Sequence, residues 1–136
     1  MRPHHTETRF MRHPAARVAL LLALAAMAPS TQADIVDIAW DANGRFERNV
    51  SVAPGKFAEL CGKLPAGLKV GWTFEASAPL DFNVHYHVGK EMVFPSKLSA
   101  VATAKDTLAT KIEQDYCWMW SNKTAAAVTI KVRLQR

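Results

Sequence analysis

The stretch LDFNVHYHV, residues 80–88, decides the fold class of this 136-residue chain. Every second position is apolar: Leu80, Phe82, Val84, Tyr86 and Val88. The positions between them are polar: Asp81, Asn83, His85 and His87. Alternation with a period of two is typical of a β-strand that buries one face. Gly89 and Lys90 predict a turn into residues 91–94, so we expect a β-hairpin over residues 80–94.

The same period continues on both sides of this hairpin. Alternating or short apolar runs, each closed by a turn signal, predict further strands at residues 35–40, 46–52, 68–76, 116–120 and 126–134. Residues 57–61 fit either a strand or one helical turn, and the Ala-, Thr- and Lys-rich residues 99–112 fit either a short helix or a loop. Seven or eight short strands predict an all-β fold, an antiparallel β-sandwich of jelly-roll type.

The N-terminal segment has the order of a secretory signal peptide. Arg9, Arg12 and Arg17 precede the apolar run VALLLALAAM, residues 18–27, and a polar stretch ends at Ala33. This run is too short to span a hydrocarbon core of about 30 Å. We therefore expect a signal peptide at residues 1–33 and a single β-sandwich domain at residues 34–136. That domain is expected to be periplasmic or secreted, with no membrane span.

The basic character of the chain belongs mostly to this leader. Residues 1–33 hold four arginines and one glutamate, a net charge of +3, so their removal lowers the formal net charge from +5 to +2. The lysines and arginines of residues 34–136 are scattered singly rather than clustered. We therefore do not expect nucleic acid as a partner.

Cys61 and Cys117 form an even pair in a chain that is expected to be exported. Under those conditions a disulfide is the default expectation. Closing a loop of this size stabilises a fold by about 4 kcal/mol in the chain-entropy model. The alternative is a pair of thiolates that bind a metal, although the chain has no CxxC spacing to favour it.

A late aromatic strand followed by an asparagine, YCWMWSN at residues 116–122, resembles a motif of the GOLD domain, a β-sandwich of eukaryotic cargo-adaptor proteins. The strand DFNVHY, residues 81–86, is similar to the middle strand of that family, and Cys61 matches its early cysteine. The resemblance covers residues 46–134 and implies a noncatalytic binding module. It departs from the family at Met119, the usual place of the late cysteine, and the chain lacks the coiled coil and membrane span of the eukaryotic members.

His85 and His87 are the sharpest chemical signal. Two imidazoles on one face of a strand, with Cα atoms about 6.5–7 Å apart, could bind a partner or ligate one Cu or Zn ion. The binding surface would comprise Asp81, Asn83, His85 and His87. The metal site would comprise His85, His87, Glu91 and Met92, with Glu91 close to His87 if the turn at Gly89 is tight. The third possibility is that both histidines are ordinary surface residues.

The remaining patterns argue against catalysis. No serine lies in a nucleophile-elbow pattern and the glycines only punctuate turns, so we expect no enzyme, with a small hydrolase as a minor alternative. Trp72, Trp118 and Trp120 could form an aromatic ligand platform, but their phase predicts core positions. We therefore expect an exported, noncatalytic binding module with no cofactor that recognises an envelope protein or another envelope component. The alternative is a periplasmic Cu- or Zn-binding protein.

Overall fold

The computed structural model describes residues 34–136, and the predicted signal peptide lies outside the described residues. These residues form seven β-strands: β1 (Asp34–Asp37), β2 (Arg45–Val52), β3 (Phe57–Leu64), β4 (Lys69–Val88), β5 (Glu91–Ala109), β6 (Gln114–Ser121) and β7 (Val128–Gln135). The all-β expectation is confirmed. In this part of the chain no helix is long and apolar enough to cross a membrane.

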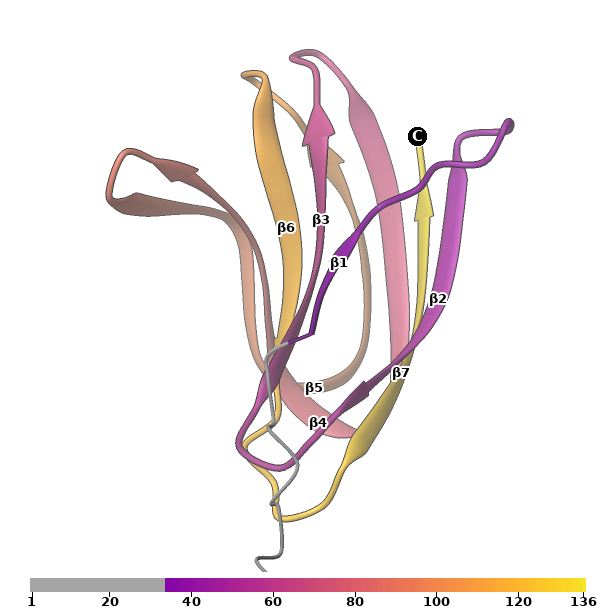
Figure 1. Ribbon diagram of the computed structural model, residues 1–136, viewed down its shortest axis with the longest axis vertical. Coiled ribbons are helices and arrows are strands. Elements are labelled where there is room, and N and C mark those ends of the chain that lie inside the picture. The colour runs from indigo at the N-terminus through magenta and orange to yellow at the C-terminus, as the bar shows by residue number, and fades with distance from the viewer. Residues whose placement is uncertain (1–33) are drawn as a thin grey trace, which may run out of the picture.

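All seven strands belong to one sheet. Its order is β1-β3-β6-β4-β7-β2, with β5 paired to β4. β1 runs parallel to β3, and the other pairings are antiparallel. The sheet curls into a nearly closed barrel (Figure 1). The predicted sandwich of two separate sheets is therefore corrected to one barrel-like sheet.

The bend of β4 is what closes the barrel. Its first half, Gly71–Ala76, pairs with β7, and its second half, Asp81–His85, pairs with β6. Between them the register with β5 shifts, around residues 75–80. The sequence predicted two strands here, at 68–76 and 80–88, because Ala78 and Pro79 interrupt the pattern. The interruption is a bend within one continuous strand.

β5 is longer than the sequence predicted. The expected hairpin at residues 80–94 is present, but its second strand continues to Ala109, so residues 99–112 are mostly strand and contain no helix. β5 pairs only with β4, which makes it an edge strand. An edge strand tolerates Pro95, whose missing N–H would break a central ladder. Residues 57–61, which the pattern left open, belong to β3.

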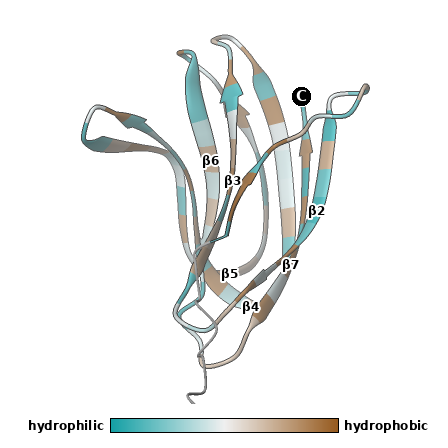
Figure 2. Ribbon diagram, viewed as in Figure 1, coloured by the Kyte–Doolittle hydropathy of each residue, from teal (hydrophilic) through white to brown (hydrophobic). Residues whose placement is uncertain are grey.

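The core lies between the two halves of the curled sheet. Figure 2 shows hydrophobic and hydrophilic residues alternating along the strands. Phe74 on the first half of β4 packs 4.8 Å from Phe82 on the second half and edge-on to Trp120, with ring centroids 5.6 Å apart. Trp118 and Trp120 are fully buried and Trp72 nearly so, which confirms their predicted core positions.

Candidate functional site

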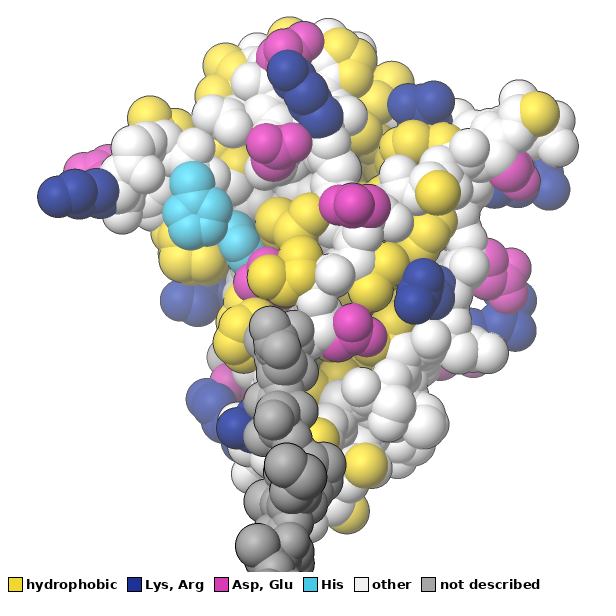
Figure 3. All heavy atoms as spheres, viewed as in Figure 1, with side chains coloured by type: hydrophobic (Ala, Val, Ile, Leu, Met, Phe, Trp, Pro, Cys, Tyr) yellow, Lys and Arg dark blue, Asp and Glu magenta, His cyan; other side chains and the backbone are white. Residues whose placement is uncertain are grey.

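The outer surface of three neighbouring strands carries the predicted histidines. Because β6 lies between β3 and β4, Cys117 is opposite both Cys61 and His85. Two residues along the strands, Glu59 and Asn83 occupy the same face. We call this surface the histidine face, formed by Glu59, Cys61, Asn83, His85, His87 and Cys117. In Figure 3 the histidine side chains lie at the base of a projecting arm, next to hydrophobic side chains.

His85 is buried, although it lies on the outer face of the barrel. Only 1% of the residue is exposed. The ring of Phe94 from β5 lies 6.1 Å away and that of His87 lies 5.3 Å away, measured between ring centroids. His87 itself is exposed. The two histidines are thus neighbours on one face, as predicted, but they have different environments.

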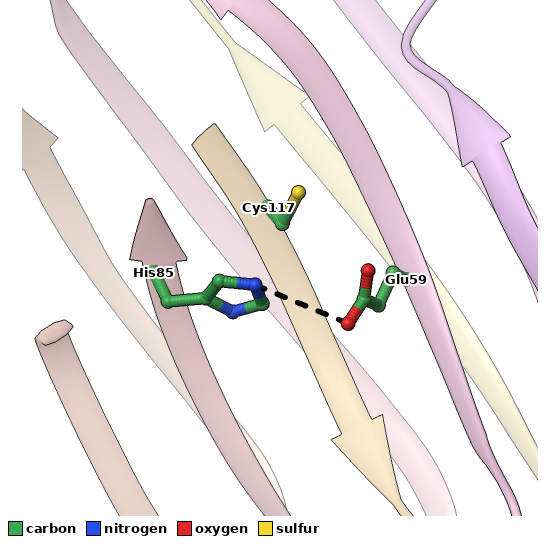
Figure 4. Close-up of side chains that lie close together, drawn as sticks. All are labelled: Glu59, His85 and Cys117. Atoms are coloured by element: carbon green, nitrogen blue, oxygen red, sulfur yellow. Dashed lines mark ion pairs between the residues drawn. The ribbon is translucent and has the colours of Figure 1, made fainter. Parts of the chain in front are cut away.

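The contacts of His85 hold its ring in one orientation. Nδ1 lies 2.8 Å from Oδ1 of Asn83, and that amide oxygen assigns the ring proton to Nδ1. Nε2 then points toward β3, where Oε1 of Glu59 lies 3.9 Å away (Figure 4). Glu59 was not predicted as a site residue. Glu59 belongs to the site because β3 and β4 both pair with β6, which lies between them.

Burial sets the charge state of this pair. It lowers the pKa of His85, and the electrostatic interaction with His87 lowers it further. Burial also raises the pKa of Glu59, an effect that His87 partly offsets. His85 is therefore a neutral imidazole at pH 7, with a lone pair on Nε2 directed toward Glu59.

The disulfide expected from the sequence is confirmed. Cys61 and Cys117 are bonded, with Cα atoms 4.1 Å apart, in directly opposite positions of β3 and β6. An open groove of about 570 Å³ lies over this bond, lined by Ile35, Asp37, Ile38, Glu59, Cys61, Gly62, Lys63, Asp115 and Cys117. The disulfide is thus part of the histidine face and is reached from solvent.

Asp81 has a local structural role. Its Oδ1 accepts a hydrogen bond of 3.0 Å from the backbone N–H of Ala100, and its other oxygen pairs with Lys123. The hydrogen bond from Lys123 is the main cause that lowers the pKa of Asp81. Ala100 adopts a left-handed conformation, with φ 53°. Asp81 therefore stabilises the place where β5 turns along the bent β4.

The register of the hairpin corrects the predicted neighbours of His87. Met92 lies directly opposite His87, whereas Glu91 lies opposite Val88. Alternation consequently places Glu91 on the other face of the hairpin. The expectation that Glu91 approaches His87 is wrong, because the two-residue turn at Gly89 pairs Val88 with Glu91. Of the predicted metal set, Glu91 therefore lies on the opposite face from His85, His87 and Met92.

The structure instead presents an apolar tip on the hairpin, which the sequence analysis did not single out. The β4–β5 hairpin projects from the barrel (Figure 1). Four large apolar residues near its end are between 36% and 50% exposed: Val88, Met92, Val93 and Phe94. We call these four residues the hairpin tip. The run Met92–Phe94, which lacks polar alternation, was the available signal.

Further hollows lie on the barrel. A pocket of about 190 Å³ opens beneath the hairpin and is lined by Tyr86, Val93, Phe94, Pro95, Ala109, Lys111 and Tyr116. A larger groove of about 710 Å³ crosses β2, β7, β4 and β5. It is lined both by charged residues that include Arg45, Glu47, Lys105 and Arg133 and by the apolar Phe46, Trp72 and Leu134. Of these two, only the first is lined by residues of the hairpin tip, namely Val93 and Phe94.

Comparison with known proteins identifies the fold but no sequence family. A scan against protein-family models finds no match, and no curated protein sequence matches the chain. The GOLD resemblance therefore has no support from sequence comparison.

Solved structures do match. A periplasmic lysozyme inhibitor of g-type lysozyme (PliG) from Aeromonas hydrophila superposes with a TM-score of 0.54 at 14% identity, over 76% of this chain and 96% of that chain. The PliG of Salmonella Typhimurium gives 0.51 at 12% identity, over 76% and 98%. A mutant PliG from Escherichia coli gives 0.51 at 10% identity, over the same two shares. At these identities the likeness shows a shared fold.

Proposed function

We propose that this chain is an exported, noncatalytic binding protein that inhibits a lysozyme-type glycoside hydrolase through its hairpin tip. The observation that carries the proposal is the cluster of four exposed apolar side chains on a projecting hairpin. Soluble proteins seldom expose such clusters unless they bind something. The likeness to three periplasmic lysozyme inhibitors supports the choice of partner.

The chemistry of the tip suits a protein partner. Met and aromatic residues are enriched in the cores of protein interfaces, and Met92 and Phe94 belong to this class. The pocket beside them, lined by Tyr86 and Tyr116 among others, could receive an anchoring side chain from the partner. His87, exposed next to Met92, would lie at the polar rim. We propose no catalytic role for any residue of the chain.

This proposal moves the binding surface from the residues that the sequence predicted to the neighbouring hairpin tip. Of the four predicted binding residues, His87 is exposed beside the tip, whereas His85 is buried and hydrogen-bonded to Asn83. We propose that His85 and Asn83 act indirectly, by supporting Phe94 and the base of the hairpin. Asp81 lies further from the hairpin tip and would act by stabilising β5 at Ala100, from whose N–H it accepts a hydrogen bond.

A charge placed on the tip tests the proposal. The double variant Met92→Asp/Val93→Asp should weaken inhibition of a g-type lysozyme at least ~30-fold, because residues at the centre of an interface typically contribute more than about 2 kcal/mol. The measurement is the rate of cell-wall lysis by the lysozyme against increasing concentrations of wild type or variant.

The matched control is Phe57→Asp. Phe57 is 37% exposed, like the tip residues, but it begins β3 rather than the hairpin. It should leave inhibition unchanged. Equal inhibition by the tip variant and the wild type would overturn the proposed surface. Lack of inhibition by the folded wild-type protein against g-, c- and i-type lysozymes alike would overturn the proposed partner.

A further inference from the structure

We propose that reduction of the Cys61–Cys117 disulfide turns the histidine face into a zinc site of two thiolates, one imidazole and one carboxylate. Within residues 34–136, one cluster of metal-ligating groups has its donor atoms within 4.8 Å of one another, and it consists of Glu59, His85 and Cys117. Cys61 adds a fourth donor, since its Sγ lies 3.8 Å from Oε2 of Glu59.

The geometry of this cluster is close to that of a tetrahedral zinc site. Typical Zn–S and Zn–N distances of about 2.3 Å and 2.0–2.1 Å place neighbouring donor atoms roughly 3.3–3.8 Å apart. The carboxylate of Glu59 already lies 3.9 Å from Nε2 of His85 and 3.8 Å from Sγ of Cys61. Once the bond between the sulfurs is broken, small side-chain rotations would bring all four donors around one point.

The surroundings of His85 resemble those of a metal ligand. Metal-binding histidines usually donate the proton of their second nitrogen to an oxygen acceptor, which fixes the ring. Here Nδ1 is held by Asn83 at 2.8 Å, and Nε2 is directed at Glu59 (Figure 4). The imidazole is thus already oriented toward the place where the metal would bind.

The groove over the disulfide provides access for a reductant and for the ion. It reaches Cys61 and Cys117 from solvent, and its walls include the carboxylates of Asp37 and Asp115. Asp37 lies directly opposite Cys61 across β1 and β3. The lining carries three acidic residues, Asp37, Glu59 and Asp115, against one cation, Lys63, so an entering cation meets an excess of negative charge.

The reaction balances with a dithiol reductant. Two electrons break the Sγ–Sγ bond, two protons convert the sulfurs to thiols, and the reductant becomes a disulfide. Each cysteine then loses its proton to solvent as zinc binds, because only the thiolate is a ligand. Reoxidation would reverse these steps and release the ion.

Zinc titration of the exported protein, purified without a histidine tag, tests this inference. The oxidised protein is compared with protein reduced by a phosphine, which takes up the oxygen of one water as it is oxidised. The reduced protein should bind one zinc at least ~100-fold more tightly than the oxidised protein. Cobalt in place of zinc should show a thiolate charge-transfer band in the reduced protein alone.

Variants separate this site from ordinary histidine binding. His85→Ala and Glu59→Gln should each weaken zinc binding by the reduced protein, and Asn83→Ala should weaken it about 10- to 100-fold through the orientation of His85. His87→Ala is the matched control and should bind normally. Circular dichroism of each reduced protein, with and without zinc, identifies variants that do not fold.

Three results would overturn the inference. The first is equal zinc affinity of the oxidised and the reduced protein. The second is loss of zinc binding in His87→Ala while His85→Ala still binds zinc. The third is a folded reduced protein whose cobalt complex lacks the thiolate band.

Discussion

The charge state of His85 is set by its burial and by its neighbours on the histidine face. It is neutral because burial opposes its charged form and because His87 stands beside it. Glu59 experiences the same burial with the opposite consequence for its pKa, which rises. The pair is therefore held together by packing rather than by a full ion pair at neutral pH. A fall in pH therefore has opposite effects on stability at the two residues: it lowers the contribution of His85 and raises that of Glu59.

The pH dependence of stability should report on His85 directly. Since its folded-state pKa is lowered, the unfolded chain binds more protons, and the free energy of unfolding should fall as pH drops below about 6.5. The slope for one such group cannot exceed about 1.4 kcal/mol per pH unit. This slope is measured by denaturant unfolding of the wild type and of His85→Gln at several pH values.

In His85→Gln this part of the slope should vanish, whereas His87→Gln should retain it. Glu59 acts in the other direction: its raised pKa removes stability as pH rises above about 4.5. A wild-type slope that persists unchanged in His85→Gln would contradict the assignment of the neutral state to His85.

The sequence identified part of this residue cluster. The disulfide followed from two cysteines in a chain that is expected to be exported, and alternation placed Asn83, His85 and His87 on one face. Glu59 could not be found in this way, because nothing local reveals that β6 lies between β3 and β4. Read as a strand, residues 57–61 already place Glu59 on the face of Cys61, so the missing information was the order of the strands.

At the scale of elements, the bent β4–β5 pair builds both halves of the barrel and the projecting hairpin. Its curvature is accommodated by register shifts on β4 and by the left-handed Ala100 on β5. Asp81 caps the N–H of Ala100 and pairs with Lys123, so the bend is stabilised from two neighbouring segments. A non-glycine residue with positive φ costs about 1–2 kcal/mol.

Replacing that residue should stabilise the protein. Ala100→Gly removes the left-handed cost but makes the unfolded chain more flexible, so the free energy of unfolding should rise by about 0.5–1 kcal/mol. Thermal or urea unfolding measures it. Ala102→Gly, two residues along the same strand without a positive φ, should instead destabilise. Equal destabilisation by both changes would contradict the account of the bend.

The elements differ in how far local pattern could predict them. The hairpin at residues 80–94 was predictable because apolar and polar residues alternate cleanly up to Gly89. Residues 99–109 were not, because Ala and Lys favour a helix whereas Thr favours a strand, and pairing with β4 decides their conformation. Strand alternation likewise shows that one face is buried, but a sandwich and a curled sheet satisfy it equally.

At the scale of the whole molecule, the barrel formed by residues 34–136 contains one disulfide and carries a projecting hairpin with an apolar end. The barrel supports the hairpin at its base through β6, and the histidine face lies at that junction. This arrangement separates the barrel from a protruding apolar hairpin. The solved structures with the same fold include periplasmic inhibitors of g-type lysozyme.

Hydrogen exchange on the purified protein, alone and mixed with a g-type lysozyme, tests this central claim most directly. The account predicts a 1:1 complex in which the amides of residues 87–94 and of the pocket beneath the hairpin become protected. Protection confined to the groove across β2 and β7, or no protection anywhere at concentrations that saturate known inhibitors, would contradict it.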